Sequence, residues 1–167
     1  HHLKYIDVHM NNLISDLQTL IQQPSISAKN EGIEECAQLV KKILRKSGIK
    51  SEILRLKNVA PIVYGEIKSK KNPSKTLMFY NHYDVQPAEP FELWDDPPFS
   101  GKIKGNKIFG SGSSDDKGEL ITRIKAAEAY LKTNGDVPCN IKFVIEGEEE
   151  TGSAHIDQYL KKYQKKF

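Results

Sequence analysis

The chain has 167 residues, 38% hydrophobic and 28% charged, which fits one soluble domain or part of one and is too short for a large enzyme. Its 25 basic and 22 acidic residues are interleaved, with a net charge of +3. No block of one sign could follow a phosphate backbone, so we expect no nucleic-acid partner. The lysines of residues 161–167 lie among aromatic residues at helical spacing, which favours a solvated helix face over a binding arm.

Cys36 and Cys139 are too few for a disulfide framework and fit a reducing compartment. The first residues contain no apolar stretch followed by a small-residue cleavage site. Nowhere do the roughly 20 apolar residues of a membrane span follow one another. We therefore expect a cytoplasmic protein without a membrane partner.

Hydrophobic periodicity predicts alternating helices and strands. Apolar residues recur at three and four over 6–21, which predicts an amphipathic helix that ends before Pro24. A second helix is predicted over 32–47, with Gly48 as its stop. Strands are expected at 53–56, 62–67 and 76–80. The third is apolar on both faces, which is typical of a central strand.

The second half begins with an irregular, proline-rich stretch over 85–99. A hairpin is predicted over 101–109 around Gly105 and Asn106, then a helix over 118–131 and a buried strand over 140–145. This alternation predicts an α/β sandwich with a mostly parallel sheet. Sites in such folds lie where strands end, and three segments rich in acids or histidine follow predicted strands or turns.

The first segment is Asn81-His82-Tyr83-Asp84, directly after the third strand. Residues two apart in an extended chain point the same way, so Asp84 can reach the His82 ring and leave one nitrogen free for a metal. A surface hydrogen-bonded pair is the competing interpretation.

The second segment, residues 110–118, places Asp115 and Asp116 in a glycine-rich turn before a helix. A phosphate cradle does not fit, because acids precede Lys117-Gly118. A calcium loop fails because its twelfth position would be Ile124 rather than a glutamate. Helix capping by Asp116 remains open and is compatible with metal binding by Asp115.

The third segment, residues 146–153, reads Glu-Gly-Glu-Glu-Glu-Thr-Gly-Ser after a buried strand. Four like charges within five residues are costly near a core unless cations neutralise them, and a metal centre would do so. An exposed acidic loop is the alternative.

Together these segments resemble the signatures of the di-zinc metallopeptidase family of carnosinase, acetylornithine deacetylase, succinyl-diaminopimelate desuccinylase and glutamate carboxypeptidase. The motifs are His-Tyr-Asp-Val-Gln-Pro, Ser-Asp-Asp-Lys-Gly and Glu-Gly-Glu-Glu-Glu-Thr-Gly-Ser, in the family's order. Residues 94–99, Trp-Asp-Asp-Pro-Pro-Phe, and the hairpin are similar to its dipeptidase branch. The resemblance covers residues 13–167.

The resemblance implies a three-layer α/β sandwich with a mixed, mostly parallel sheet, of which residues 1–167 form the N-terminal part of the catalytic domain. It implies two zinc ions, with cobalt or manganese as possible substitutes. His82 would be a terminal ligand of one zinc, oriented by Asp84, and Glu150 would bind the second zinc. Asp115 would bridge both zincs, and the peptide bond that follows it would be cis. Glu149 would be the general base, with Asp116 and Glu148 as supporting or exposed acids.

Two departures from the family are visible. Ser111 stands where the family usually has arginine, which removes no ligand. The family's further carboxylate ligand, late histidine ligand and lid domain have no counterpart among these residues, and His155 and Asp157 are expected to be solvated. Because catalytic zinc generally has three protein ligands, this chain alone should be inactive and bind zinc weakly.

The sequence therefore predicts a metal-dependent hydrolase, a zinc dipeptidase that cleaves a small peptide with an activated water and is a homodimer when full length. An N-acyl amino-acid deacylase with an N-acyl amino-acid substrate is the runner-up. A non-catalytic metal-binding module is the other class. Intact His82, Asp115, Glu149 and Glu150 argue against the module, because a lost activity would not require the base.

Overall fold

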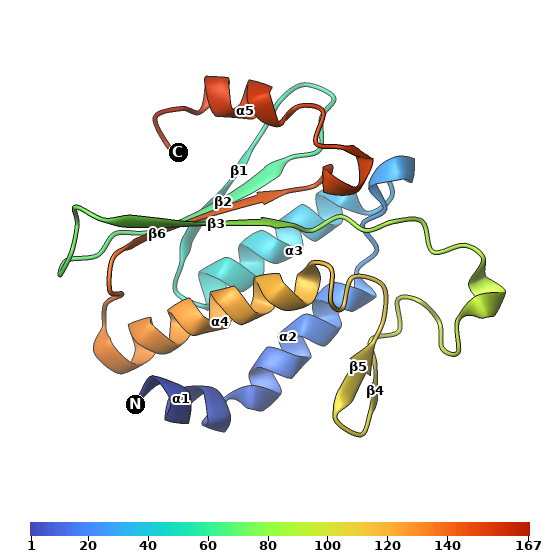
Figure 1. Ribbon diagram of the computed structural model, residues 1–167, viewed down its shortest axis with the longest axis horizontal. Coiled ribbons are helices and arrows are strands. Elements are labelled where there is room, and N and C mark those ends of the chain that lie inside the picture. Colours follow the sequence, from blue (N-terminus) through green and yellow to red (C-terminus); the bar gives the residue numbers. More distant parts are fainter.

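The computed structural model describes residues 1–167 and consists of a central sheet with helices on both faces (Figure 1). Helices α2, α3 and α4 cover one face and the short α5 covers the other, so the predicted three-layer α/β sandwich is confirmed. The helices are α1 (His2–Val8), α2 (Met10–Gln22), α3 (Ile33–Lys46), α4 (Lys117–Asn134) and α5 (Ile156–Lys162), with short 3₁₀ helices η1 (Ser27–Lys29), η2 (Phe91–Leu93) and η3 (Glu149–Thr151).

The main sheet has the order β1-β2-β6-β3, formed by β1 (Lys50–Leu54), β2 (Ile62–Ile67), β6 (Asn140–Glu146) and β3 (Thr76–His82). It is mixed, as predicted, but not mostly parallel: only β3 and β6 are parallel, whereas β1–β2 and β2–β6 are antiparallel. The connection between β1 and β2 is too short for a crossover, and the connection between β3 and β6 contains α4, which supplies one.

The expectation that the third strand is central is wrong for this chain. β3 lies at the sheet edge and β6 lies between β2 and β3. Three of its apolar residues are therefore partly in solvent, with exposures of 46% for Leu77, 43% for Met78 and 46% for Tyr80. In β3 the apolar run therefore indicates neither two covered faces nor a neighbouring strand on each edge.

The core lies mainly between the sheet and α2, α3 and α4, in a cluster of 21 buried residues. A smaller cluster of five lies under α5 and includes Tyr159. The helix predicted over 6–21 is two helices that meet at His9, whose ring nitrogen Nδ1 lies 2.8 Å from the Tyr5 carbonyl oxygen. None of the helices combines the length and apolar character that crossing a bilayer requires.

The first strand is displaced: β1 covers Lys50–Leu54, whereas the sequence predicts it over 53–56. The other elements agree with the predictions within a few residues. Helix α3 ends just before Gly48, which has a φ of 86°. The hairpin of β4 (Lys102–Lys104) and β5 (Lys107–Phe109) turns at Gly105, where φ is 60°. Both cysteines are free, and Cys36 is buried.

Candidate metal centre

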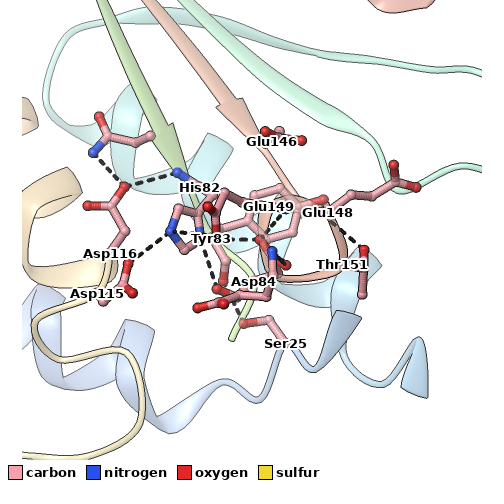
Figure 2. A network of polar contacts seen from close by, with 12 residues as sticks. Ser25, His82, Tyr83, Asp84, Asp115, Asp116, Glu146, Glu148, Glu149 and Thr151 are labelled. Carbon is pink, nitrogen blue, oxygen red and sulfur yellow. Dashed lines mark hydrogen bonds and ion pairs between the residues drawn. The ribbon is translucent and has the colours of Figure 1, made fainter. Parts of the chain in front are cut away.

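The parallel strands β3 and β6 bring two of the predicted segments together. His82, the last residue of β3, is paired with Glu146, the last residue of β6, and the Tyr83 amide donates a hydrogen bond of 2.9 Å to the Glu146 carbonyl oxygen. The residues after both strands therefore lie side by side, as Figure 2 shows.

Residues after β3 alternate between the core and the site. Tyr83 and Val85 are buried at 0% and 2% exposure, and the Tyr83 hydroxyl donates to the Pro61 carbonyl oxygen at 2.6 Å. His82 and Asp84 point the other way, toward the acidic segments (Figure 2). This is the period-two arrangement predicted from the sequence.

Asp84 contacts the His82 ring as predicted. Its Oδ1 lies 3.2 Å from His82 Nδ1, and both side chains are buried. Burial would lower the pKa of His82, but the hydrogen bond and charge of Asp84 raise it to about 9. Despite burial, the His82 ring and backbone N–H donors hold the pKa of Asp84 below its ordinary value. The surroundings of His82 thus favour positive charge.

Asp84 also anchors the acidic segment, a role that the sequence did not reveal. Its Oδ1 accepts the Glu149 amide at 3.2 Å and its Oδ2 accepts the Glu150 amide at 3.0 Å. One carboxylate therefore orients the histidine ring and fixes the start of η3, because these two donors have no partner within that short helix.

The second predicted segment joins the site through Asp115. The peptide bond between Asp115 and Asp116 is cis, as the resemblance implied. Asp115 Oδ1 lies 3.0 Å from His82 Nε2, and its side chain is 76% exposed.

Asp116 connects the Asp115 turn to the end of β3. Its buried carboxylate accepts hydrogen bonds from the His82 amide at 3.0 Å and the Asn81 side chain at 2.9 Å. Asp116 does occupy the N-cap position of α4, but the expected capping by its side chain is wrong, because that side chain makes no cap hydrogen bond. The carboxylate instead accepts hydrogen bonds from the His82 amide and the Asn81 side chain at the end of β3.

Lys117 fastens the other end of this loop. It is fully buried, and its Nζ donates at 2.8 Å to the carbonyl oxygens of Leu20 and Gln23 at the end of α2. Burial lowers the pKa of Lys117. Gly118 leaves no room for a side chain, since a Cβ there would lie 2.1 Å from the Ser113 carbonyl oxygen. The turn with Asp115 is thus held to α2 as well as to β3.

The third segment completes the cluster. His82, Glu149 and Glu150 each offer one ligand atom, all within 4.8 Å of one another. Glu149 Oε2 lies 3.6 Å from His82 Nε2. Desolvation and the neighbouring carboxylates raise the pKa of Glu149 despite the opposing effect of His82.

These side chains fit a bound cation. Asp115, Glu149 and Glu150 form no ion pair with any lysine or arginine, and the charged partner of the first two is the His82 ring. Imidazole nitrogen and carboxylate oxygens are the donors that zinc and related divalent ions take in proteins. Apart from the His82 ring, no basic side chain neutralises the negative charge of these three carboxylates.

The remaining acids of the third segment have different partners. Glu146 is buried and accepts hydrogen bonds from the hydroxyls of Tyr80 and Ser153. Glu148 lies 2.9 Å from His155 Nδ1. Asp157 is exposed, as expected, and His155 is half-buried against Glu148. The segment is thus no freely solvated acidic loop.

A sequence model of peptidase family M20/M25/M40 matches residues 78–167, more than half of the chain. Human Beta-Ala-His dipeptidase is 36% identical over 65% of the chain and 21% of its own length. Succinyl-diaminopimelate desuccinylase of Blochmanniella pennsylvanica is 32% identical over 83% of the chain and 35% of its own length.

The solved structure of the di-peptidase Dug1p from Saccharomyces cerevisiae superposes with a TM-score of 0.85 at 30% identity, over 99% of this chain and 38% of that one. The chain thus spans from 21% to 38% of the length of these three proteins. The match over β3 to α5, together with the shared fold, shows that the chain belongs to peptidase family M20/M25/M40.

Proposed function

We propose that the protein is a metal-dependent hydrolase that cleaves the amide bond of a dipeptide or small peptide with a zinc-activated water. The observation that carries this proposal is the group of His82, Glu149 and Glu150, with Asp115 3.0 Å from the same His82 nitrogen; the three carboxylates have no lysine or arginine to balance them. Membership in a peptidase family supports the reaction class.

In this proposal His82, Asp115 and Glu150 would hold two zinc ions, and cobalt or manganese could substitute. Asp84 keeps the His82 ring oriented through Nδ1, so that Nε2 faces the cluster. Bound zinc would polarise the scissile carbonyl and lower the pKa of water toward about 7.

Glu149 acts as the general base in this mechanism. It takes a proton from the attacking water and returns it to the leaving nitrogen, which must not depart as an amide anion. The position of Glu149 supports this assignment, because its Oε2 lies 3.6 Å from His82 Nε2, beside the proposed metal ligands.

The test is Glu149→Gln in the product of the complete reading frame that contains this chain. We expect zinc content to stay unchanged and dipeptide turnover to fall by about 10²- to 10⁴-fold, the size of a general-base contribution. Zinc is measured by elemental analysis and turnover by release of free amino acid. Glu148→Gln is the matched control, since Glu148 pairs with His155 instead, and it should keep most activity. Undiminished turnover in Glu149→Gln would refute the assignment.

A second candidate is an N-acyl amino-acid deacylase, which the similarity to a desuccinylase supports. The same site would cleave the amide between an acyl group and an amino acid. Parallel assays with a dipeptide and with N-succinyl and N-acetyl amino acids separate the two. If a zinc-loaded protein hydrolyses none of these three substrates, the result would favour a non-catalytic metal-binding module.

We further propose that residues 1–167 form the N-terminal part of a zinc-binding catalytic domain and that the full-length protein is a cytoplasmic homodimer. Two free cysteines support a reducing compartment. Size-exclusion chromatography with light scattering tests the dimer.

A further inference from the structure

Gln86 is a polar residue beside the candidate metal site, and it has no role in the proposed mechanism. Its exposed side chain lies four residues after His82, in the segment that leaves β3. The Gln86 amide nitrogen Nε2 donates a hydrogen bond of 2.7 Å to Glu150 Oε2 and lies 3.4 Å from the Glu150 carbonyl oxygen.

We infer that Gln86 is a positioning residue that orients the Glu150 carboxylate for metal binding. This inference rests on the proposed function, in which Glu150 is a metal ligand. The first reason is direction: alternate residues of an extended segment point the same way, so Gln86 follows His82 and Asp84 toward the site while Val85 is buried in the core.

The second reason is that the backbone on both sides of Gln86 is anchored. The Val85 amide donates to the Ser25 carbonyl oxygen at 2.8 Å, and Val85 forms a parallel bridge with Ile26. Ala88 is 4% exposed. Because the backbone is already fixed, forming the hydrogen bond costs only the freedom of the Gln86 side chain and none of the backbone. The amide can therefore hold its acceptor in place.

The third reason is that Asp84 and Gln86 hold different parts of the same residue. Asp84 accepts the Glu150 amide, while Gln86 donates to one carboxylate oxygen and leaves the other to a metal. Glu149 receives no such bond from Gln86; its carboxylate lies near the His82 ring. Gln86 thus distinguishes two adjacent glutamates, with a neutral donor that does not compete with a cation.

The experiment measures zinc affinity by competition with a chromophoric chelator, using the product of the complete reading frame. Gln86→Met keeps the length of the side chain and removes the donor. We expect zinc binding about 10- to 100-fold weaker, the usual effect of losing an outer hydrogen bond to a ligand. The melting temperature of the metal-free protein should not change, because the side chain is exposed.

The matched control is Gln38→Met. Gln38 is also exposed and donates to a glutamate carboxylate, Glu34 Oε1 at 3.0 Å, on α3. It should leave zinc binding unchanged. Equal loss of affinity in both variants would overturn the inference.

A double-mutant cycle with Glu150→Gln tests whether Gln86 acts through Glu150. If it does, Gln86→Met causes little further loss of affinity in the Glu150→Gln background. A loss as large as in the parent protein would overturn the inference. So would unchanged zinc binding in Gln86→Met while Glu150→Gln binds zinc weakly, an outcome that leaves the proposed function intact. Unchanged binding in Glu150→Gln would instead refute the proposed ligand set, and the inference with it.

Discussion

Gly147, between β6 and η3, is packed against the Tyr83 ring. A Cβ at this position would lie 2.2 Å from the Tyr83 hydroxyl oxygen and 2.4 Å from Cζ. The ring cannot yield, because it is fully buried and its hydroxyl is bonded to Pro61. The glycine thus allows the chain to pass close to Tyr83 and turn into the segment that carries Glu149 and Glu150.

We therefore expect Gly147→Ala to reduce the free energy of unfolding by about 1 to 3 kcal/mol, the range for overpacking. Urea denaturation measures this value. Gly65→Ala in β2 is the matched control, since a Cβ there would meet its nearest atoms at 3.3 and 3.4 Å. Its loss should be clearly smaller. Equal losses would show that contact with Tyr83 is not the cause.

Helices α2, α3 and α4 are joined by ion pairs around the buried Asp16, one to the buried Lys125 and one to the exposed Lys46. Asp16 Oδ2 lies 2.7 Å from Lys125 Nζ of α4, and Oδ1 pairs with Lys46 of α3. Burial alone would raise the pKa of Asp16, but the two lysines lower it overall. Asp16 therefore contributes stability in full above about pH 4, the ordinary carboxyl range, and loses it as the pH falls through its lowered pKa.

Replacing Asp16 with alanine should destabilise the protein by about 2 kcal/mol at pH 7, because the buried Lys125 then loses its nearest carboxylate and keeps the more distant Glu128, 3.6 Å away. The difference from the parent protein should shrink as the pH falls below 4. Urea denaturation at several pH values measures both effects. Glu119→Gln, which removes an exposed pair with Arg123 on α4, should cost less than about 0.5 kcal/mol. A deficit of the Asp16 variant that did not change with pH would contradict the ion-pair explanation.

At the scale of the molecule, the ligands proposed within residues 1–167 would be only part of the set that two zinc ions need. Under the proposed function, His82, Asp115 and Glu150 would supply too few ligands for two zinc ions, because catalytic zinc generally has three protein ligands. The open edge of β3, with Leu77, Met78 and Tyr80 partly in solvent, also leaves one side of the site without a neighbouring strand.

The chain produced alone should therefore bind zinc weakly and hydrolyse no dipeptide. Isothermal titration with zinc and an amino-acid release assay provide the measurements. Two tight sites, or robust hydrolysis by residues 1–167 alone, would refute this expectation.

Local features of the fold and the site were predictable from the residue order. Helical and strand periods follow from which residues a segment buries, so α3, α4, β2 and β6 were identified within a few residues. The pairing of His82 with Asp84 is equally local, because alternation in an extended chain places residues two apart on one side.

Contacts between distant residues needed the folded chain. Asp116 binds the amide of a residue 34 positions away, and Gln86 binds Glu150 across 64 positions. The edge position of β3 and the antiparallel pairing of β1 and β2 likewise depend on which strands meet along their hydrogen-bonding edges. Periodicity records only whether a side chain is buried. The partner of a backbone edge or of a carboxylate is set by how the elements pack in space.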